Sequence, residues 1–464
     1  MEEWWPQERS TDYRSKPPRA NRCAFLVPGA VPKDGCDTLA GWPGERGLRD
    51  VGEPTGLQEQ PQYSGNRTMN KRALLIGSSF SAAPMLFRLK RRGIHVSVCG
   101  SAPSDPCHQY GDASFFVDYS KREALLELVK AEGFDYIVPT CNDYSYMSGA
   151  WVADQIGLPG FDRFEVAEKL HTKDGFRGVT NACGTPAPRA IWVRPDEPYA
   201  LPDSGFPLLV KPVDSFSGRG VTKVEDAASL DAAVRSAMAA SRSASAVIEN
   251  FVEGDLYSHS AYIKGGKVAV DFFVDEFCTV YPYQVNCSNY PSRLPDHVRE
   301  GVREAMNDLI ARLDLVDGLL HTQFISNGRD FWIIECMRRC PGDLYGGLVE
   351  RSEGIDYTDM FVQPFIGEEL RMPDLSAAPR SIGRHTISFA QPLVFQSFSC
   401  DFPGSNLEVV PLKNSGESVG VAPFDKLAIT FHEYASADQM FTHTPKLHEY
   451  VRMKRLDIQQ QVGE

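Results

Sequence analysis

The chain has 464 residues, an apolar content of 42% and a formal net charge of −13 at pH 7. It is too long for one compact core, so we expect roughly two to four domains of ordinary globular composition. The acidic balance excludes a broad nucleic-acid surface, which requires a basic stripe. It still allows a small anionic ligand to bind in a local basic pocket.

The sequence carries no segment typical of membrane insertion or secretion. No uninterrupted apolar stretch approaches the roughly 20 residues of a membrane span. The N-terminus, Met1–Trp5, is acidic where a signal peptide is basic. The 11 cysteines form no CxxC pair, which fits reduced and mostly buried thiols. We therefore predict a cytoplasmic protein without membrane contact and without a disulfide framework.

Residues 1–68 differ from the rest of the chain. They are rich in Pro and Gly and hold few apolar residues in any periodic arrangement. Such a stretch cannot bury enough surface to offset its ordering entropy. Met69 stands directly before the first clear strand. We predict that 1–68 is a disordered or artefactual leader; a docking arm that uses Trp4, Trp5 and Trp42 is the functional alternative.

The stretch 69–165 alternates strands and helices. Its expected strands are 72–76, 94–99 and 135–139, with one helix ending at Arg92 and another spanning 122–132. This βαβ order implies a parallel sheet with ligands at the carboxyl ends of its strands. The loop after the first strand lacks G-x-G-x-x-G, so a nicotinamide enzyme is only a distant alternative. Asn142 and Asp143 follow the third strand, where they face either a substrate or solvent.

The most informative segment is Leu209–Val221. An apolar strand ends at Lys211, opens into a Ser/Gly loop and resumes at Val221, which predicts a hairpin with a polar, cationic tip. The tip offers backbone N–H groups, hydroxyl donors and positive charge to a polyphosphate. These groups belong to Ser215, Ser217, Gly218, Arg219 and Gly220. Taken alone, the segment is equally consistent with a basic surface hairpin.

The remaining elements follow a regular order. Helices are expected around 163–171, 174–183, 226–241 and 296–313, and strands at 245–252, 257–263, 267–274, 321–326 and 331–335. Lys264-Gly-Gly266 is a hairpin signal between two of these strands. Beyond residue 375 the pattern predicts strands at 408–412 and 426–431 and a basic helix near 444–456.

Four motifs stand in a characteristic order. They are Lys173 with Gly184-x-Pro186, Lys211 with its Ser/Gly hairpin, Glu249-Asn-Phe-Val252 with Glu253-Gly254, and His321-Thr-Gln-Phe324 before Ile333–Gly342. Together they resemble the ATP-grasp superfamily of ADP-forming ligases, including its carbamoyl-phosphate-synthase-like members. The resemblance implies an α/β ATP-grasp fold, in which two α+β subdomains grip ATP. The implied domains are a Rossmann-like domain at 69–165, an ATP-grasp domain at 166–375 with its lid at about 185–252, and a C-terminal subdomain at 376–464.

The resemblance also implies a nucleotide site. Two lysines hold the ATP phosphates, a flexible lid covers them, and a hinge strand reads the adenine edge through its backbone. The resemblance implies that Glu253 or Asp255 binds the ribose hydroxyls, because Leu256 stands where an acid is usual. The implied nucleotide-binding residues are Lys173, Lys211, Ser215, Ser217, Gly218, Gly220, Glu249, Asn250, Phe251, Val252, Glu253 and Asp255.

The implied magnesium site departs from the family pattern. The family has acids at two positions of this site. Glu335 occupies one of them, but Gln323 occupies the other, and Met337 replaces the motif asparagine. A Gln carbonyl can ligate Mg²⁺ without charge, whereas a thioether is too soft for it. A carboxylate on an otherwise apolar strand is costly unless a cation binds it, which favours Glu335 as a metal ligand.

The implied catalytic residues are Arg339, which matches the motif arginine, and Lys211. Because Arg338 and Arg339 alternate along a strand, we expect one of them to be a structural ion-pair partner of Asp343 or Glu350. A guanidinium suits a γ-phosphate or acyl-phosphate oxygen.

The resemblance implies ATP-dependent joining of a small-molecule carboxylate to an amine, with amino acids as the expected substrates. The carboxylate attacks the γ-phosphate, and the acyl phosphate formed is captured by the amine, with ATP and Mg²⁺ as cofactors. A catalytically impaired nucleotide-binding protein is the second hypothesis, favoured by Gln323 and Met337. A homodimer is an alternative to a monomer that the sequence does not decide.

Overall fold

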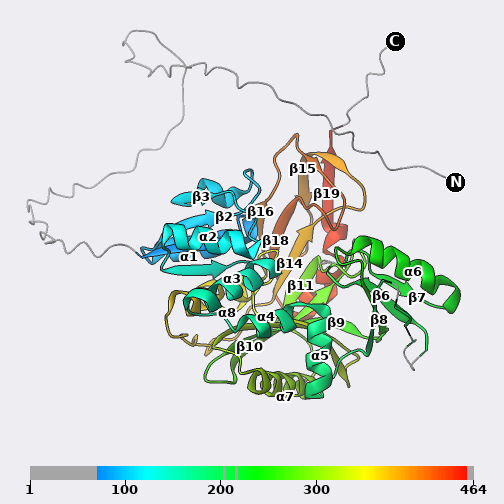
Figure 1. Ribbon diagram of the computed structural model, residues 1–464. Helices are drawn as coiled ribbons and strands as arrows, with labels where there is room; N and C mark the ends of the chain where they lie inside the picture. The colour runs from blue at the N-terminus through cyan, green and yellow to red at the C-terminus, as the bar shows by residue number, and fades with distance from the viewer. Residues whose placement is uncertain (1–70, 196, 200, 202–204, 215–217, 457–464) are drawn as a thin grey trace, which may run out of the picture. The chain divides into compact units, whose positions relative to one another are not determined.

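The computed structural model describes residues 71–195, 197–199, 201, 205–214 and 218–456. The chain divides into two units, Met1–Gly65 and Asn66–Glu464, and every described residue belongs to the second (Figure 1). The leader predicted at 1–68 lies outside the described residues. The predicted boundaries between the later domains remain predictions.

A parallel sheet forms the first part of the described chain and confirms the βαβ prediction. Its order is β3-β2-β1-β4, and each neighbouring pair is parallel. The strands are β1 (Arg72–Ile76), β2 (His95–Cys99), β3 (Ala113–Phe115) and β4 (Tyr136–Pro139). The helices are α1 (Ala83–Arg91), α2 (Arg122–Glu132) and α3 (Asp143–Ile156), with the short 3-10 turns Phe80–Ala82 and Pro106–Gln109. The short edge strand β3 escaped sequence analysis because three residues show no usable alternation.

A small antiparallel sheet with order β5-β8-β6-β7 contains the predicted hairpin (Figure 1). Its strands are β5 (Ala190–Val193), β6 (Leu208–Pro212), β7 (Thr222–Val224) and β8 (Ala246–Asn250), and helix α6 (Ala227–Ala240) packs on β6. Apolar residues of α6, β6 and β8 form a separate core. The hairpin therefore has its own small folding unit, apart from the main sheet.

The main sheet has the order β13-β12-β9-β10-β11-β14-β18-β16. Its strands are β9 (Asp255–Ile263), β10 (Val268–Phe277), β11 (Cys287–Tyr290), β12 (Gly318–Ser326), β13 (Phe331–Met337), β14 (Ile382–Ile387), β16 (Asn406–Pro411) and β18 (Ala428–Glu433). The associated helices are α4 (Phe164–His171), α5 (Lys173–Cys183), α7 (Asp296–Leu313), α8 (Tyr345–Glu353) and α9 (Tyr357–Val362), with a 3-10 turn at Pro364–Ile366. Strands β9, β10, β12 and β13 pair antiparallel, as the predicted hairpins require.

The end of the chain differs from the sequence prediction. The helix predicted near 444–456 is wrong: a helix at α10 (Ala437–His443) and a 3-10 turn at Thr444–Tyr450 lead into β19 (Val451–Arg455). Strand β19 pairs with β15 (Leu393–Cys400), whose other neighbour is β17 (Ser418–Val419). The alternation of half-buried Val451 and Met453 with exposed residues suits an edge strand, and tertiary pairing decides between the two structures.

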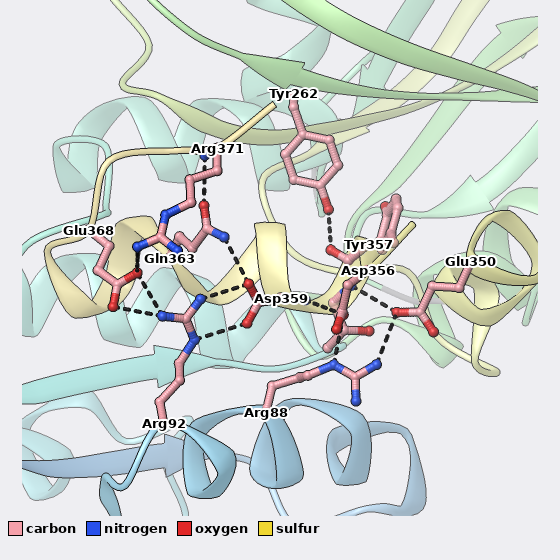
Figure 2. A network of polar contacts seen from close by, with 11 residues as sticks. Arg88, Arg92, Tyr262, Glu350, Asp356, Tyr357, Asp359, Gln363, Glu368 and Arg371 are labelled. Carbon is pink, nitrogen blue, oxygen red and sulfur yellow. Dashed lines mark hydrogen bonds and ion pairs between the residues drawn. The ribbon is translucent and has the colours of Figure 1, made fainter. Parts of the chain in front are cut away.

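Charged side chains tie α1 to the segment around α9. Arg92, at the end of α1, donates to both carboxylate oxygens of Asp359 and to Glu368, with distances of 2.6 to 2.9 Å (Figure 2). Arg88 donates to Asp356 at 2.7 Å and lies 3.9 Å from Glu350. This network fixes the parallel sheet against the main sheet and so positions the strand ends of β1, β2 and β4.

Candidate active site

Two lysines meet where α5 approaches the lid sheet. Thr172 caps α5 by accepting from the N–H of Gly175 at 3.3 Å, which places Lys173 at the first helical residue. The Lys173 Nζ donates to the Val213 carbonyl at 3.2 Å, two residues beyond Lys211. Burial lowers the pKa of Lys173, and the positive charge of Lys211 lowers it further. The structure therefore brings the two predicted phosphate lysines together from separate elements.

Lys211 already has a carboxylate partner in the protein. Its Nζ lies 2.5 Å from Glu249 Oε2, while the Arg177 guanidinium contacts the other oxygen of Glu249 at 2.9 to 3.0 Å. All three side chains are buried, with 7%, 1% and 3% exposure for Lys211, Glu249 and Arg177. Burial lowers the pKa of Lys211, although Glu249 opposes this. The triad carries one net positive charge, which suits an anionic ligand.

Arg177 was missed by sequence analysis, although a signal was present. It lies four residues after Lys173 and therefore on the same face of α5. The Glu249 side chain was grouped with the hinge, yet it points to Lys211 and Arg177. Burial alone would raise the pKa of Glu249, but Lys211 and Arg177 hold it below its usual value.

The predicted metal ligands stand opposite each other on β12 and β13. Gln323 pairs with Glu335 in the strand register. Glu335 is exposed rather than buried, so the desolvation argument made from the sequence does not apply to it. Within the described residues, no hydrogen bond or ion pair involves its carboxylate. Its negative charge opposes the lowering of the pKa of both lysines and helps to raise the pKa of Arg339.

A third acidic side chain, missed from the sequence, contacts Gln323. The Gln323 Nε2 donates to Glu276 Oε2, on β10, at 2.7 Å. Burial raises the pKa of Glu276 to about 7, against the opposing effect of Arg384 and the hydrogen bonds of Ser258 and Gln323. The adjacent acids of Asp275 and Glu276 in a strand rich in apolar residues were the available signal. Because the amide nitrogen binds Glu276, the Gln323 oxygen is the end left for a cation.

The two motif arginines bind acids other than those predicted. Arg338 is buried and donates to Asp162 at 2.6 Å and to two main-chain carbonyls. Arg339 forms a two-point contact with Asp143, with distances of 2.8 and 2.9 Å. The expected pairing with Asp343 or Glu350 is therefore wrong, because both partners come from the segment before α4, far away in sequence. Strand β13 ends at Met337, so both arginines lie in the turn after it, and they still bind different partners as expected.

Asp143 is a buried site residue and not a solvated turn residue. It begins α3 directly after β4, where Asn142 caps the helix by accepting from the Tyr144 N–H. His171 lies 2.9 Å from its carboxylate. Burial alone would raise the pKa of Asp143, but Arg339 and His171 hold it well below its usual range. The carboxyl end of the parallel sheet is thereby tied to Arg339.

Two of the predicted hinge amides are already hydrogen-bonded within the protein. The N–H of Phe251 donates to the Pro207 carbonyl at 3.2 Å and that of Asn250 to Arg189 at 3.1 Å, so neither amide is available to an adenine. In the described residues the N–H of Val252 has no such acceptor. The lid glycines Gly218 and Gly220 both have positive φ, near +70°. Ser215 and Ser217 lie outside the described residues.

The two candidate ribose acids line one shallow groove. Glu253 and Asp255 border it with Gly254, Tyr257 and the β12–β13 turn, and its volume is about 370 Å³. Both carboxylates are exposed, and Asp255 lies 3.8 Å from Arg293.

A family model described as an ATP-grasp domain matches residues 204–344, which hold the lid hairpin, β9 to β13 and the motif arginines. Together with the order of the strands around it, this match shows that the chain contains an ATP-grasp domain. The predicted fold class is confirmed. In the described residues, no helix is long and apolar enough to cross a bilayer.

Two curated relatives of the chain carry the same name. The chain is 29% identical over 196 residues to the formate-dependent phosphoribosylglycinamide formyltransferase of Synechococcus sp. (strain WH7803), covering 41% of this chain and half of the relative's length. It is 25% identical over 330 residues to the enzyme of that name from Paraburkholderia xenovorans (strain LB400), covering 66% of this chain and 78% of the relative.

Solved structures show the same fold at lower identity. A phosphoribosylglycinamide synthetase from Anaerococcus prevotii superposes with a TM-score of 0.67 at 17% identity, over 83% of this chain and 99% of that one. An L-amino acid ligase from Bacillus licheniformis gives a TM-score of 0.67 at 18% identity, over 84% and 99%. The relatives thus share the fold and differ in the substrates that their names state.

Proposed function

We propose that the protein activates a small-molecule carboxylate with ATP and joins it to an amine, with amino acids as substrates and ADP and phosphate as products. The observation that carries the proposal is the convergence of Lys173 from α5, Lys211 from β6, and Glu335 and Arg339 from β13 and the loop that follows it. Positive and negative side chains face one another there, as in-line transfer of a phosphoryl group requires.

The nucleotide is held mainly by positive charge. Lys173 and Lys211 bind phosphate oxygens, with the backbone N–H groups of Gly218 and Gly220 as further donors. Val252 offers its free N–H to the adenine edge, and Glu253 or Asp255 binds the ribose hydroxyls. The Lys211–Glu249–Arg177 contacts keep the lysine in one position before the nucleotide arrives, which reduces the cost of ordering it.

The donor set fits Mg²⁺ carried in with the nucleotide. Glu335 and the Gln323 oxygen would hold it, since both are the oxygen ligands that Mg²⁺ prefers. Bound there, the ion would offset phosphate charge during transfer. In the described residues, no group of three or more His, Cys, Asp or Glu side chains forms a metal site by itself. The protein therefore supplies few ligands, and phosphate oxygens and water supply the others.

Arg339 acts from the side of the parallel sheet. Asp143 fixes two nitrogens of its guanidinium, so the side chain is oriented before substrate binds. The substrate carboxylate attacks the γ-phosphate and releases ADP. The amine then attacks the acyl carbon, phosphate leaves, and the nitrogen loses its proton to form the amide.

Gln323 and Met337 favour one competing function, a nucleotide-binding protein without ligase activity. The two hypotheses are separated by magnesium-dependent ADP release over a panel of amino acids, with formate added as a further carboxylate because of the relatives' names. ATP affinity is measured in parallel by calorimetry. ADP release that requires both a carboxylate and an amine supports the ligase. ATP binding without ADP release under every pairing supports the competing function. The ATP-grasp match leaves the nicotinamide alternative without support.

A further inference from the structure

The main sheet carries a polar strip beyond the proposed nucleotide site. Glu276 on β10 stands opposite Ser288 on β11, and Ser288 stands opposite Arg384 on β14. Directly opposed residues of neighbouring strands share one face of a sheet. Gln323, beside Glu335, contacts Glu276, so the strip continues from the proposed metal ligands to Arg384.

Arg384 is a buried cation without an acidic partner. Its side chain is 3% exposed, and it donates to the Asp343 carbonyl and to the Ser288 hydroxyl, each at 2.8 Å. Its Nε has no hydrogen-bond acceptor. In the part of the chain that the structure describes, no carboxylate forms an ion pair with it. A guanidinium buried among neutral groups is costly, and an anionic ligand removes that cost.

Glu276 is the acidic side chain of the same strip. It is 5% exposed and contacts the neutral side chains of Gln323 and Ser258, while the nearby charge of Arg384 lowers its pKa and that of Glu335 raises it. Among the described residues it has no ion-pair partner. Glu276 and Arg384 therefore lie on either side of Ser288, near enough for Arg384 to lower the pKa of Glu276, but no ion pair joins them among the described residues.

Helix α8 adds a second anion-binding feature beside Arg384. Leu344 precedes the helix with a φ of +54° and provides no side-chain cap. The Arg384 guanidinium lies 5.9 Å from the ring of Tyr345, the first residue of the helix. The N–H groups of Tyr345 and Gly347 donate to the carbonyls of Gly342 and Leu344, so the helix contributes mainly through its dipole, which favours negative charge at this end.

We propose that this strip binds the amine substrate, and that this substrate carries an anionic group. Arg384 and the first turn of α8 bind the carboxylate or phosphate, and Glu276 faces the ammonium group. The amine then lies toward Gln323 and Glu335, where the proposed function places the acyl phosphate. The orientation of the substrate, with its amine toward Gln323 and Glu335, rests on the proposed function. The site itself rests on the positions of Arg384 and Glu276.

Binding to the full-length protein tests the site without turnover. Calorimetry in the presence of Mg²⁺ and a non-hydrolysable ATP analogue compares L-alanine, O-phosphoethanolamine, ethylamine and propionate. We expect L-alanine or O-phosphoethanolamine to bind about tenfold more tightly than either ethylamine or propionate. Whichever of L-alanine and O-phosphoethanolamine binds more tightly shows whether the site takes a carboxylate or a phosphate. Equal affinity for all four probes, or binding of none, overturns the proposal.

Variants assign the effect to the two charges. Arg384→Gln should weaken the anionic amines about tenfold and leave ethylamine unchanged, and Arg384→Lys should recover part of the loss. Glu276→Gln should weaken the amines and leave propionate unchanged. Arg351→Gln, on α8 and paired with Glu408, is the control. Unchanged affinities in Arg384→Gln overturn the proposal; if that variant does not fold, Arg384→Lys and the wild-type probe series decide it. ATP-analogue affinity should stay constant throughout, so a failure of this site is distinct from a failure of the nucleotide site.

Discussion

Arg92 and Arg384 show how differently two regions of this molecule treat an arginine. Arg92, in the interface of α1 with α9, has a side chain that is 18% exposed, and it binds two carboxylates (Figure 2). Arg384 is 3% exposed and binds none among the described residues. A buried charge needs a counter-charge more than an exposed one does. Stability alone would therefore favour acidic partners for Arg384 rather than for Arg92. The paired region supports the fold, and the unpaired region is arranged for a ligand.

Glu335 provides the strongest test of this comparison, because it is an unpaired acid in the proposed active site. Glu335→Gln should reduce magnesium-dependent ADP formation by about 100-fold or more, since it removes the charged oxygen ligand of the metal. The melting temperature should hardly change, because the side chain is exposed and has no protein partner among the described residues. A magnesium titration with ATP bound, monitored by ADP release, measures the effect.

Two further variants control this test. Gln323→Glu should tighten the apparent magnesium affinity, because a charged oxygen replaces a neutral one. Glu300→Gln, an exposed substitution on α7, should behave as wild type. Full activity in Glu335→Gln would remove the proposed metal role.

Lys211 is a paired charge within the site, and its replacement separates the ligand role from the structural one. Lys211→Ala should weaken ATP binding far more than AMP binding, because the lost contact is to a distal phosphate. Glu249 keeps Arg177 as a partner, so the fold should be retained. Calorimetry with both nucleotides measures the difference, with Lys264→Ala, whose partner is Glu369, as the control. Equal weakening of ATP and AMP would contradict a phosphate role.

The elements of the fold were largely predictable from local patterns. Helix α7 matches its predicted limits of 296–313, and the turn at Lys264–Gly266 joins β9 to β10 as predicted. These predictions depend on periodicity and turn residues, which a short window of sequence contains. The C-terminal strand β19 depends instead on pairing with β15, and the sequence prediction of a helix there was wrong.

The partners of the site residues were not predictable in the same way. Asp143 and Arg339 lie 196 positions apart, and Asp162 and Arg338 lie 176 apart, so only the folded chain shows that they meet. Glu276 and Arg384 carried no family motif, and the strand register alone places them on one face. Lys173, Lys211 and Glu335 were accessible because each stands in a recognisable motif.

Arg92 tests the paired side of the comparison. Arg92→Ala should lower the free energy of unfolding by about 2 kcal/mol, because Asp359 loses its bidentate partner and Glu368 keeps only Arg371. ATP affinity should remain within about twofold of wild type, since the network contacts no proposed ligand residue. Denaturant unfolding and calorimetry measure the two quantities. A loss of ATP affinity larger than the loss of stability would show that the interface also shapes the site.

The pH dependence of stability tests a second paired charge, that of Asp271, with a smaller expected effect. Its side chain is 12% exposed and faces Arg303 at 2.8 Å and His259 at 3.0 Å. Burial alone would raise the pKa of Asp271, but the hydrogen bonds to His259 and Arg303 lower it to about 2. The unfolded chain binds the proton at a pKa of about 3.9, so the ionised carboxylate contributes about 2 kcal/mol of stability above that pH.

This contribution should disappear as the pH falls toward the folded value. Urea unfolding of wild type and Asp271→Asn should differ by about 2 kcal/mol near neutral pH, and the difference should shrink between about pH 4 and pH 2. The comparison between the two proteins cancels the other acids that titrate in this range. A difference that stays constant with pH would mean that Asp271 acts through the shape of its hydrogen bonds and not through its charge.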